Sequence, residues 1–378
     1  MRNLWNDSRE KPLMSVVESV LVVGTGLIGT SVALALREHD VTVYLADKNP
    51  GAVRLARELG AGTEWEPGVR ADLAVISVPP QVVAEQLKEL QDQGAARFYT
   101  DVASVKAVPL ADAVRLGCDV RSYVAGHPLA GRERSGPAAA RADLFLGRPW
   151  AYCPIEETSP EAVETLLGLI KLCGGEAVRV AAEEHDRAVA VVSHAPHVTA
   201  AAVAARLAEA PERALGLAGQ GVRDVTRIAA GDPALWTGIL SGNALPVAEV
   251  LEAVAEDLKA AASALRRSAA DEDPAADREA AMDWVTGLLD RGVTGTGRIP
   301  GKHGGPARTY AAVTVLVGDR PGELAKLFQI AEDAGVNIED VRLEHAPGLP
   351  LGAAELSVQP PAAATLAEAL RRHGWHLR

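Results

Sequence analysis

A histidine stands among oppositely charged residues in segment 126–136, which reads GHPLAGRERSG. Glycine and proline frame this segment, so we predict a loop that follows the apolar strand 123–125. His127 could act as a general base because an imidazole titrates near neutral pH, and Arg132 and Glu133 add charges of both signs. A loop histidine is often only a surface residue. Its place at a strand end and its charged neighbours favour an active site that handles an anion and a proton.

A second polar cluster lies in a part of the chain rich in helix-forming residues. His194 and His197 are spaced i, i+3, which places them on one helix face, and Ser193 precedes them. No cysteine or carboxylate at suitable spacing completes a metal site nearby. We therefore expect no metal here and favour a polar pocket for an oxygen-rich substrate.

A third cluster follows at residues 222–236. Arg223 and Arg227 are spaced i, i+4, so they would share a face of one helix. A buried arginine is costly unless it is paired, and a bidentate bond to a substrate carboxylate would pair it. The alternative is a structural network with Asp224. Trp236 is a candidate wall of the same pocket.

The sequence GTGLIG at residues 24–29 lies between a predicted strand and a predicted helix. That context makes it a dinucleotide-binding turn, in which one glycine permits the tight turn, one lets the pyrophosphate approach and one lets helix and strand pack closely. The pyrophosphate would lie at the helix N-terminus. The candidate cofactor-binding residues of this turn are Gly24, Thr25, Gly26, Leu27, Ile28 and Gly29.

Asp47 ends the second predicted strand and is placed to accept hydrogen bonds from the adenosine ribose. A carboxylate there repels a 2′-phosphate, so NAD is favoured over NADP, although Lys48 softens that preference. FAD is the other dinucleotide that this turn could hold. An exposed aspartate beside a glycine-rich structural turn is the remaining alternative.

Two more polar segments follow apolar strands, at 77–79 and at 101–106. The carboxyl ends of parallel strands line the ligand crevice of a doubly wound sheet, so Ser77, Val78 and Pro79 are candidate cofactor contacts. Ser104 would point toward the same crevice, or it would cap a helix.

Strands alternate with helices in the first half of the chain, which predicts an α/β Rossmann-type doubly wound domain. An all-α domain of Ala- and Leu-rich segments follows, with more apolar helix surface than one subunit covers, so we expect a homodimer. The end of the chain reads as a ferredoxin-like βαββαβ unit. The expected parts are a flexible leader (1–16, with Met14 an alternative start), the Rossmann domain (17–182), the helical domain (183–290), a Gly-rich linker (291–308) and the C-terminal unit (309–378).

The net charge of −12 argues against a nucleic-acid or anionic membrane surface. Three separated cysteines, without a CxxC pair, fit a reducing cytoplasm. We expect no membrane span, because no uninterrupted apolar run approaches about 20 residues.

These segments together resemble the prephenate/arogenate dehydrogenase family. The matching strings are VGTGLIG (23–29), DVASVK (101–106), GHPLAG (126–131), SHAPH (193–197) and DVTRIA (224–229). The resemblance implies that NAD⁺ takes a hydride from the ring carbinol of prephenate while the ring carboxylate leaves as CO2, giving 4-hydroxyphenylpyruvate for tyrosine synthesis.

The resemblance also implies roles for single residues. His127 would accept the proton of the ring hydroxyl, and Ser104 would orient that hydroxyl. Arg227 would clamp a substrate carboxylate, and His197 would contact the pyruvyl end. Further candidates by this resemblance are Ser193 and His194 near that end, Asp186 and Asp224 as supports of the polar network, and Glu133 as a partner of Arg227 that gates entry.

Arg132 occupies a place where many relatives carry a small hydroxyl residue, and its charge could favour prephenate over arogenate. Arogenate or an amino-substituted prephenate analogue is the alternative substrate. A non-catalytic sensor on the same fold and a β-hydroxyacid dehydrogenase are rival classes, but the latter use a lysine where segment 193–197 carries histidines.

The segment DRPGELAKLF (319–328), followed by GVNI (335–338), resembles an ACT domain. Gly322 would let backbone come close to a bound amino acid, and Asn337 lies where the next strand begins. The resemblance implies an amino-acid effector, with tyrosine as the leading candidate, or a domain that only helps assembly.

Overall fold

The computed structural model describes residues 17–131, 135–270, 274–300, 309–345 and 350–378. It divides into two compact units, Met1–Ala255 and Glu256–Arg378. The predicted leader 1–16, residues 301–308 of the predicted linker, and both Arg132 and Glu133 lie outside the described residues.

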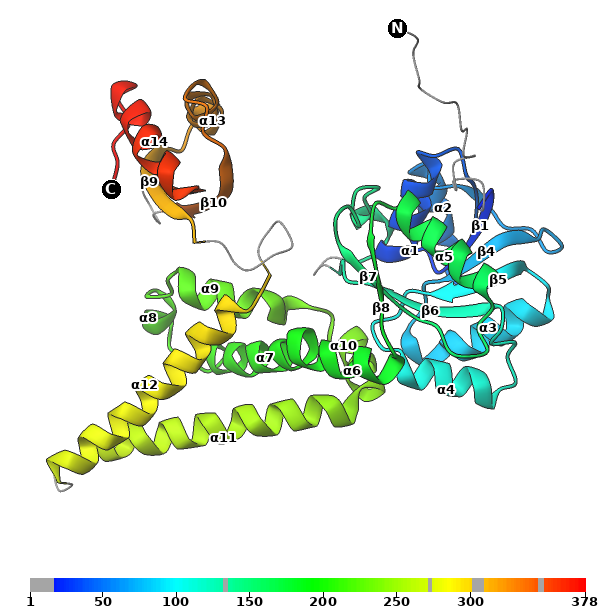
Figure 1. Cartoon of the computed structure of the whole chain (residues 1–378), viewed down its shortest axis with the longest axis horizontal. Coiled ribbons are helices and arrows are strands. Elements are labelled where there is room, and N and C mark those ends of the chain that lie inside the picture. The colour runs from blue at the N-terminus through cyan, green and yellow to red at the C-terminus, as the bar shows by residue number, and fades with distance from the viewer. Residues whose placement is uncertain (1–16, 132–134, 271–273, 301–308, 346–349) are drawn as a thin grey trace, which may run out of the picture. The chain divides into compact units, whose positions relative to one another are not determined.

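The first unit begins with an eight-stranded sheet, drawn in Figure 1. Its strands are β1 (Ser19–Val23), β2 (Thr42–Ala46), β3 (Thr63–Glu64), β4 (Ala71–Ile76), β5 (Ala96–Asp101), β6 (Tyr123–Pro128), β7 (Pro149–Cys153) and β8 (Glu176–Arg179). The order β3-β2-β1-β4-β5-β6-β7-β8 reverses direction between β1 and β4, which is the switch point of a doubly wound fold. The predicted parallel sheet is confirmed for β1 to β6, whereas β7 runs antiparallel to β6 and β8 pairs parallel to β7.

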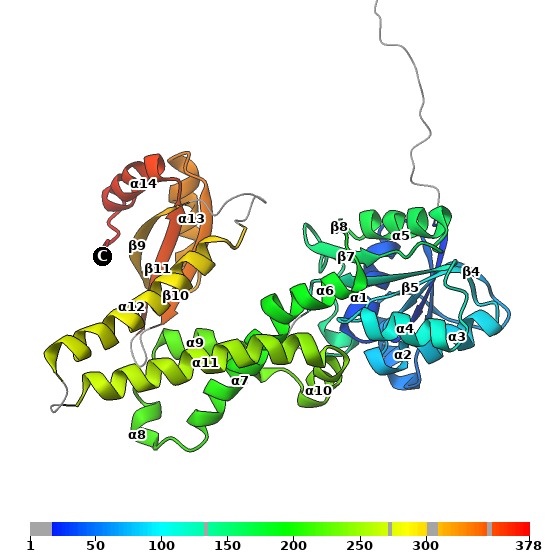
Figure 2. The same ribbon diagram turned by 60° about the horizontal axis from the view of Figure 1, so that its bottom comes forward.

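Helices cover both faces of this sheet. One face carries α1 (Leu27–Arg37), α2 (Pro50–Glu58) and α5 (Pro160–Leu172), and the other carries α3 (Val83–Asp92) and α4 (Ala107–Arg115), which lie side by side in Figure 2. Alternate strand residues face opposite layers: Val20 and Val22 belong to the first core and Leu21 and Val23 to the second. Such fully apolar strands are typical of a sheet that is buried on both faces.

A continuous helical rod, Ala182–Leu207, follows the sheet. It comprises α6 (Ala182–Val189), a π-helical turn (Ala190–His194) and α7 (Ala195–Leu207). Pro196 has no N–H to give to the preceding turn, and a local π-helical turn accommodates such a gap. Among the described helices this rod is long and apolar enough to cross a membrane by length and composition, and the bent pair Pro233–Gly242 and Ala244–Ser268 passes only if both count as one span; core helices pass the same test. His194 lies in the π-helical turn and His197 lies in the first turn of α7, and both side chains are buried.

Shorter helices complete the helical part of the first unit. They are α8 (Glu212–Leu215), α9 (Gln220–Thr226), a 3₁₀ turn (Arg227–Ala230), α10 (Pro233–Gly242) and the first part of α11 (Ala244–Ser268), which crosses the unit boundary. Arg227 caps the C-terminus of α9 and begins the 3₁₀ turn, and its N–H bonds to the carbonyl of Arg223. The expected i, i+4 placement of the two arginines on one helix face is therefore confirmed.

The second unit holds α12 and a small sheet. Helix α12 (Ala275–Gly297) continues through Gly292, Gly295 and Gly297, so the linker predicted to start at 291 begins too early. Each exposed glycine costs a helix only about 1 kcal/mol relative to alanine, which a helix of this length tolerates.

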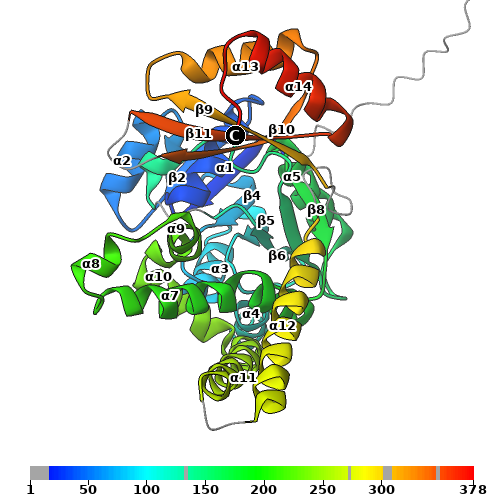
Figure 3. The same cartoon turned by 90° about the vertical axis from the view of Figure 1, so that its left-hand side faces the viewer.

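The small sheet is antiparallel, in the order β10-β11-β9. Its elements are β9 (Ala311–Gly318), α13 (Glu323–Asp333), β10 (Ile338–His345), β11 (Leu351–Val358) and α14 (Pro360–Arg372). Leu377 then bridges to Val315 of β9, where a last short strand was expected. Figure 3 shows α13 and α14 on the same face of the sheet, where their apolar sides bury a core of their own.

Candidate active site

His127 lies on β6 itself, one residue before its end, rather than on the predicted loop after it. The strand places it at the carboxyl edge of the sheet, beside the switch-point crevice. Gly126 precedes it, and a Cβ there would lie 2.9 Å from the Asp101 carbonyl oxygen and 3.2 Å from Trp150 Nε1. Only glycine fits this position without a shift of its neighbours.

His127 stands at the end of a line of three hydrogen-bonded side chains. Its Nδ1 lies 2.8 Å from Nε2 of His185, and Nδ1 of His185 lies 2.8 Å from Oδ1 of Asp186. A carboxylate only accepts, so His185 donates from Nδ1 and its Nε2 accepts. His127 must then donate from Nδ1. This line fixes the tautomer of His127 and leaves its Nε2 with a free lone pair.

The surroundings of His127 keep the imidazole neutral. Burial, together with the charges of His185, Lys106 and His194, holds the pKa of His127 well below its ordinary value. For Asp186, burial alone would raise the pKa, but hydrogen bonds from His185 and from the backbone of Ala107 and Lys106 lower it overall. A neutral base therefore lies at one end of the line, and an ionised carboxylate that accepts several hydrogen bonds lies at the other.

A buried ion pair that the sequence analysis did not single out lies beneath His127. Lys106 Nζ contacts Asp101 Oδ1, and both side chains are completely buried. Asp101 Oδ2 also accepts hydrogen bonds from the Tyr123 hydroxyl at 2.6 Å and from the Gly126 N–H at 3.3 Å. Asp101 and Lys106 were quoted only as the ends of the DVASVK segment, where their i, i+5 spacing carries no pairing signal.

The histidines of the SHAPH segment form an aromatic cluster with Trp236. The ring of His197 stacks on Trp236 with centroids 3.5 Å apart, and His194 meets Trp236 edge-on at 6.1 Å. Asn243 donates to Nδ1 of His194 at 3.0 Å and to the carbonyl of Asp186 at 2.7 Å. Burial lowers the pKa of His194 to about 4. The expected grouping of His194, His197 and Trp236 is thus present, and Asn243 is an unpredicted member that joins it to Asp186.

The dinucleotide turn has the geometry that its glycines suggested. Gly24 has φ +98°, and a Cβ on it would lie 2.2 Å from the Ser77 carbonyl oxygen; a Cβ on Gly29 would lie 2.0 Å from the Gly24 oxygen. At Gly26 a Cβ would meet nothing within 4 Å. Gly26 also precedes α1 without a side-chain cap, and the first N–H bonded back to it is that of Thr30, so the N–H groups of Leu27, Ile28 and Gly29 precede the first hydrogen bond of the helix. This turn fits a pyrophosphate.

Asp47 holds the dinucleotide turn from the end of β2. Its Oδ2 accepts from the Thr25 N–H at 2.7 Å and from the Thr25 hydroxyl at 3.1 Å, and its Oδ1 accepts from the Asn49 N–H at 2.8 Å. A carboxylate acceptor therefore sits where an adenosine ribose would need one. Ser77 follows β4, and its N–H bonds the Val23 carbonyl at 2.7 Å, which brings the segment of Val78 and Pro79 next to the turn.

We call the hydrogen-bonded side chains of His127, His185 and Asp186 the histidine line. Among the described residues, neither Ser104 nor Ser193 forms a hydrogen bond to it. Ser104 is half-buried after β5, and the alternative that it caps a helix is wrong, because Lys106 precedes α4. Ser193 is exposed in the π-helical turn.

The charged residues of the predicted arginine cluster are exposed to solvent, whereas a buried arginine was expected. Arg227 is exposed and forms no ion pair with the described part of the chain. Asp224 is also exposed and accepts a hydrogen bond from Gln220 at 2.8 Å, so the structure does not bring it to the histidine line.

Within the described ranges no group of three or more His, Cys, Asp or Glu side chains could hold a metal ion. In the small C-terminal domain, Gly322 (φ +86°) precedes α13 with no atom within 4 Å of where its Cβ would lie. Asn337 donates to Glu339 at 2.9 Å.

Two family models match this chain. One is described as the nucleotide-binding domain of prephenate dehydrogenase and matches residues 32–179; the other is described as its dimerization domain and matches residues 181–274. The probable prephenate dehydrogenase NovF of Streptomyces niveus is 41% identical over 361 residues, which cover 95% of this chain and 99% of that protein.

Solved structures share the fold. The crystal structure of A. aeolicus prephenate dehydrogenase in complex with hydroxyphenyl propionate and NAD⁺ is 27% identical with a TM-score of 0.64, covering 74% of this chain and 97% of that one. Synechocystis arogenate dehydrogenase is 25% identical with a TM-score of 0.57, covering 72% and 99%.

Proposed function

The chain belongs to the prephenate dehydrogenase family, and we propose that it catalyses the NAD-dependent oxidative decarboxylation of prephenate to 4-hydroxyphenylpyruvate. The observation that carries this proposal is the His127–His185–Asp186 line, which leaves Nε2 of a neutral His127 outside its hydrogen bonds, near the carboxyl end of β6. Such a nitrogen is suited to remove the proton of a ring hydroxyl.

Proton removal is the step for which this site is built. As the carbinol carbon loses hydride, positive charge develops on it, and deprotonation of its hydroxyl stabilises that charge. His127 Nε2 accepts the proton, His185 keeps the imidazole in the required tautomer, and Asp186 stabilises the positive charge that the line then carries. General bases of this kind contribute typically about 10²–10⁴ in rate.

NAD⁺, when bound, supplies the hydride acceptor. Gly24, Gly26 and the N-terminus of α1 would hold its pyrophosphate, and Asp47 would accept from its adenosine ribose. A carboxylate at this place disfavours a 2′-phosphate, so we expect NAD⁺ to be used in preference to NADP⁺.

The remaining substrate contacts are assigned by position. The His197–Trp236 stack and buried His194 offer a flat, weakly basic wall for the pyruvyl end. Ser104 would orient the ring hydroxyl. Arg227 is exposed and pairs with no carboxylate in the described ranges, so its guanidinium is suited to bind a substrate carboxylate.

Assembly and regulation are further parts of the proposal. We expect a homodimer through the helical domain, because apolar side chains such as Val192 (68% exposed) and Leu217 (87% exposed) remain uncovered. The βαββα unit with its terminal bridge would be an ACT domain that binds tyrosine near Gly322 and Asn337. A cytoplasmic location is supported by three buried free thiols, Cys118, Cys153 and Cys173.

The proposal is tested by initial rates of NAD⁺ reduction with prephenate, arogenate and a panel of 3-hydroxy acids, with the product identified chromatographically. We expect prephenate to give the highest kcat/KM and 4-hydroxyphenylpyruvate to form. A higher kcat/KM with arogenate would overturn the choice of substrate. No reduction with either ring substrate would overturn the proposed function. The same assay with added tyrosine tests the effector, for which unchanged rates would count against regulation.

A further inference from the structure

The buried pair of Lys106 and Asp101 transfers no proton and binds no substrate in the chemistry described above, yet it is expensive to maintain. Two charges removed from water are tolerated only when further hydrogen bonds satisfy their remaining donors and acceptors. Asp101 meets this condition with bonds from the Ala103 N–H at 2.8 Å, the Tyr123 hydroxyl and the Gly126 N–H, beside its contact with Lys106. Lys106 Nζ donates to Asp101 and to the Gly126 carbonyl, so the pair forms a hydrogen-bonded network near the carboxyl ends of β5 and β6.

This network holds both polar atoms of one peptide residue. Lys106 Nζ donates to the Gly126 carbonyl at 2.6 Å, and Asp101 Oδ2 accepts from the Gly126 N–H. Gly126 is the residue before His127, and it has no side chain that could anchor it otherwise. Together with the pairing of β6 and β7, the ion pair thus fixes the backbone that carries the imidazole.

Lys106 also reaches the other end of the histidine line. Its backbone N–H donates to Oδ1 of Asp186 at 2.8 Å, and the next N–H, of Ala107, donates to Oδ2 at 2.9 Å. These contacts form a closed ring of hydrogen bonds and chain links. It runs from Lys106 Nζ through Gly126 to His127, then through His185 and Asp186 back to the Lys106 backbone.

We propose that Lys106, paired with Asp101, is a positioning residue for the base: it joins the backbone that carries His127 to the carboxylate that orients His127. The inference rests on the proposed function. It gives the pair a catalytic consequence, since misplacement of a reacting group by about 1 Å can cost on the order of 10²-fold in rate. A pair that served stability alone would have no such consequence.

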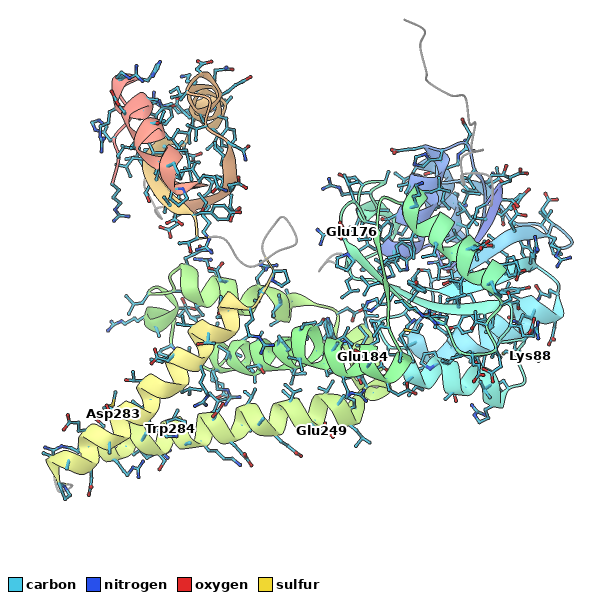
Figure 4. All side chains as sticks on the ribbon, viewed as in Figure 1. Lys88, Glu176, Glu184, Glu249, Asp283 and Trp284 are labelled. Atoms are coloured by element: carbon cyan, nitrogen blue, oxygen red, sulfur yellow. The ribbon has the colours of Figure 1, made fainter. Side chains whose placement is uncertain are left out.

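The test compares Lys106→Met with Asp101→Asn/Lys106→Met, which removes both charges at once. Lys88→Met is the matched control, because Lys88 pairs with Asp92 on the outer surface of α3, where it is labelled in Figure 4. For each purified protein kcat and KM are measured with prephenate and NAD⁺, with thermal unfolding as the check of folding. We expect kcat to fall at least tenfold in both Lys106 variants with KM within about twofold, and no change in Lys88→Met.

A double-mutant cycle with His127→Asn decides whether Lys106 acts through His127. In the His127→Asn background, Lys106→Met should lower kcat by less than about twofold, because the group that it positions is gone. A full tenfold loss in that background would overturn the proposal, as would a folded Lys106→Met enzyme with wild-type kcat. Failure of both Lys106 variants to fold would assign the pair to stability and also overturn it. A wild-type enzyme that does not oxidise prephenate would refute the proposed function instead.

Discussion

His185 offers the sharpest perturbation of the histidine line, because it touches His127 and Asp186 and has no assigned contact with substrate. His185→Leu removes the acceptor of the His127 Nδ1–H, now 2.8 Å away, and leaves that buried donor unsatisfied. His127 can then place its proton on Nε2, where it no longer acts as a base. His185→Gln is the matched variant, because its amide oxygen can accept from His127 while its nitrogen donates to Asp186.

The expected magnitude follows from the lost hydrogen bond. An unsatisfied buried donor costs about 1–3 kcal/mol, and each 1.36 kcal/mol is a factor of ten in rate. We therefore expect kcat of His185→Leu to fall about 5- to 150-fold and that of His185→Gln to fall less than about fivefold. KM for prephenate should stay within about twofold in both.

The assay is steady-state reduction of NAD⁺ at saturating cofactor, on proteins whose thermal unfolding shows that they are folded. A His185→Leu enzyme with wild-type kcat would refute the view that this line sets the tautomer of the base. A fall in kcat/KM that came entirely from KM would refute it equally, since His185 would then contribute to binding.

Three further outcomes follow from the structure. Because burial first, and His185 and Lys106 after it, hold the pKa of His127 low, kcat/KM should keep its plateau down to about pH 6; a decline centred on the ordinary imidazole value of about 6.5 would contradict this. Burial lowers the pKa of His194 to about 4, so the unfolded chain binds the proton first as pH falls. The free energy of unfolding should then drop by roughly 2 kcal/mol between about pH 7.5 and 5, measured by urea denaturation. Equal slopes in the wild type and His194→Asn would speak against it. Gly26→Ala has room for its Cβ, so its thermal stability should match the wild type while its KM for NAD⁺ rises about tenfold as the methyl enters the pyrophosphate space; an unchanged KM would place the cofactor elsewhere.

Most strands and helices could be predicted from the sequence, because apolar runs and glycine positions restrict the backbone within a few residues. The strand 19–23 and the glycine turn were predicted correctly, since an apolar run and residues able to adopt positive φ leave few alternatives. The antiparallel strand β7 was missed, because the direction of a short strand depends on the long connection before it. Helix α12 runs past its glycines into residues predicted to be linker, since its length outweighs a few weak helix formers.

The site was predictable in part for a similar reason. His127, His194, His197 and Trp236 stood out because their residue types are rare in this chain and because they lie in short segments (126–136, 193–197 and 222–236) that also hold charged or hydroxyl residues. The contacts that His185, Lys106 and Asn243 make could not be predicted, because 58 positions separate His127 from His185 and 57 separate Asn243 from Asp186. Only the assembled sheet and helices bring such residues within hydrogen-bonding distance.

The central claim is that His127 is the base, and His127→Asn tests it most directly. Asparagine keeps a polar side chain of similar reach but cannot accept the proton at neutral pH. We predict that kcat for prephenate with saturating NAD⁺ falls by about 10²–10⁴ while KM stays within about threefold. A folded His127→Asn enzyme with kcat within about threefold of the wild type would contradict the account.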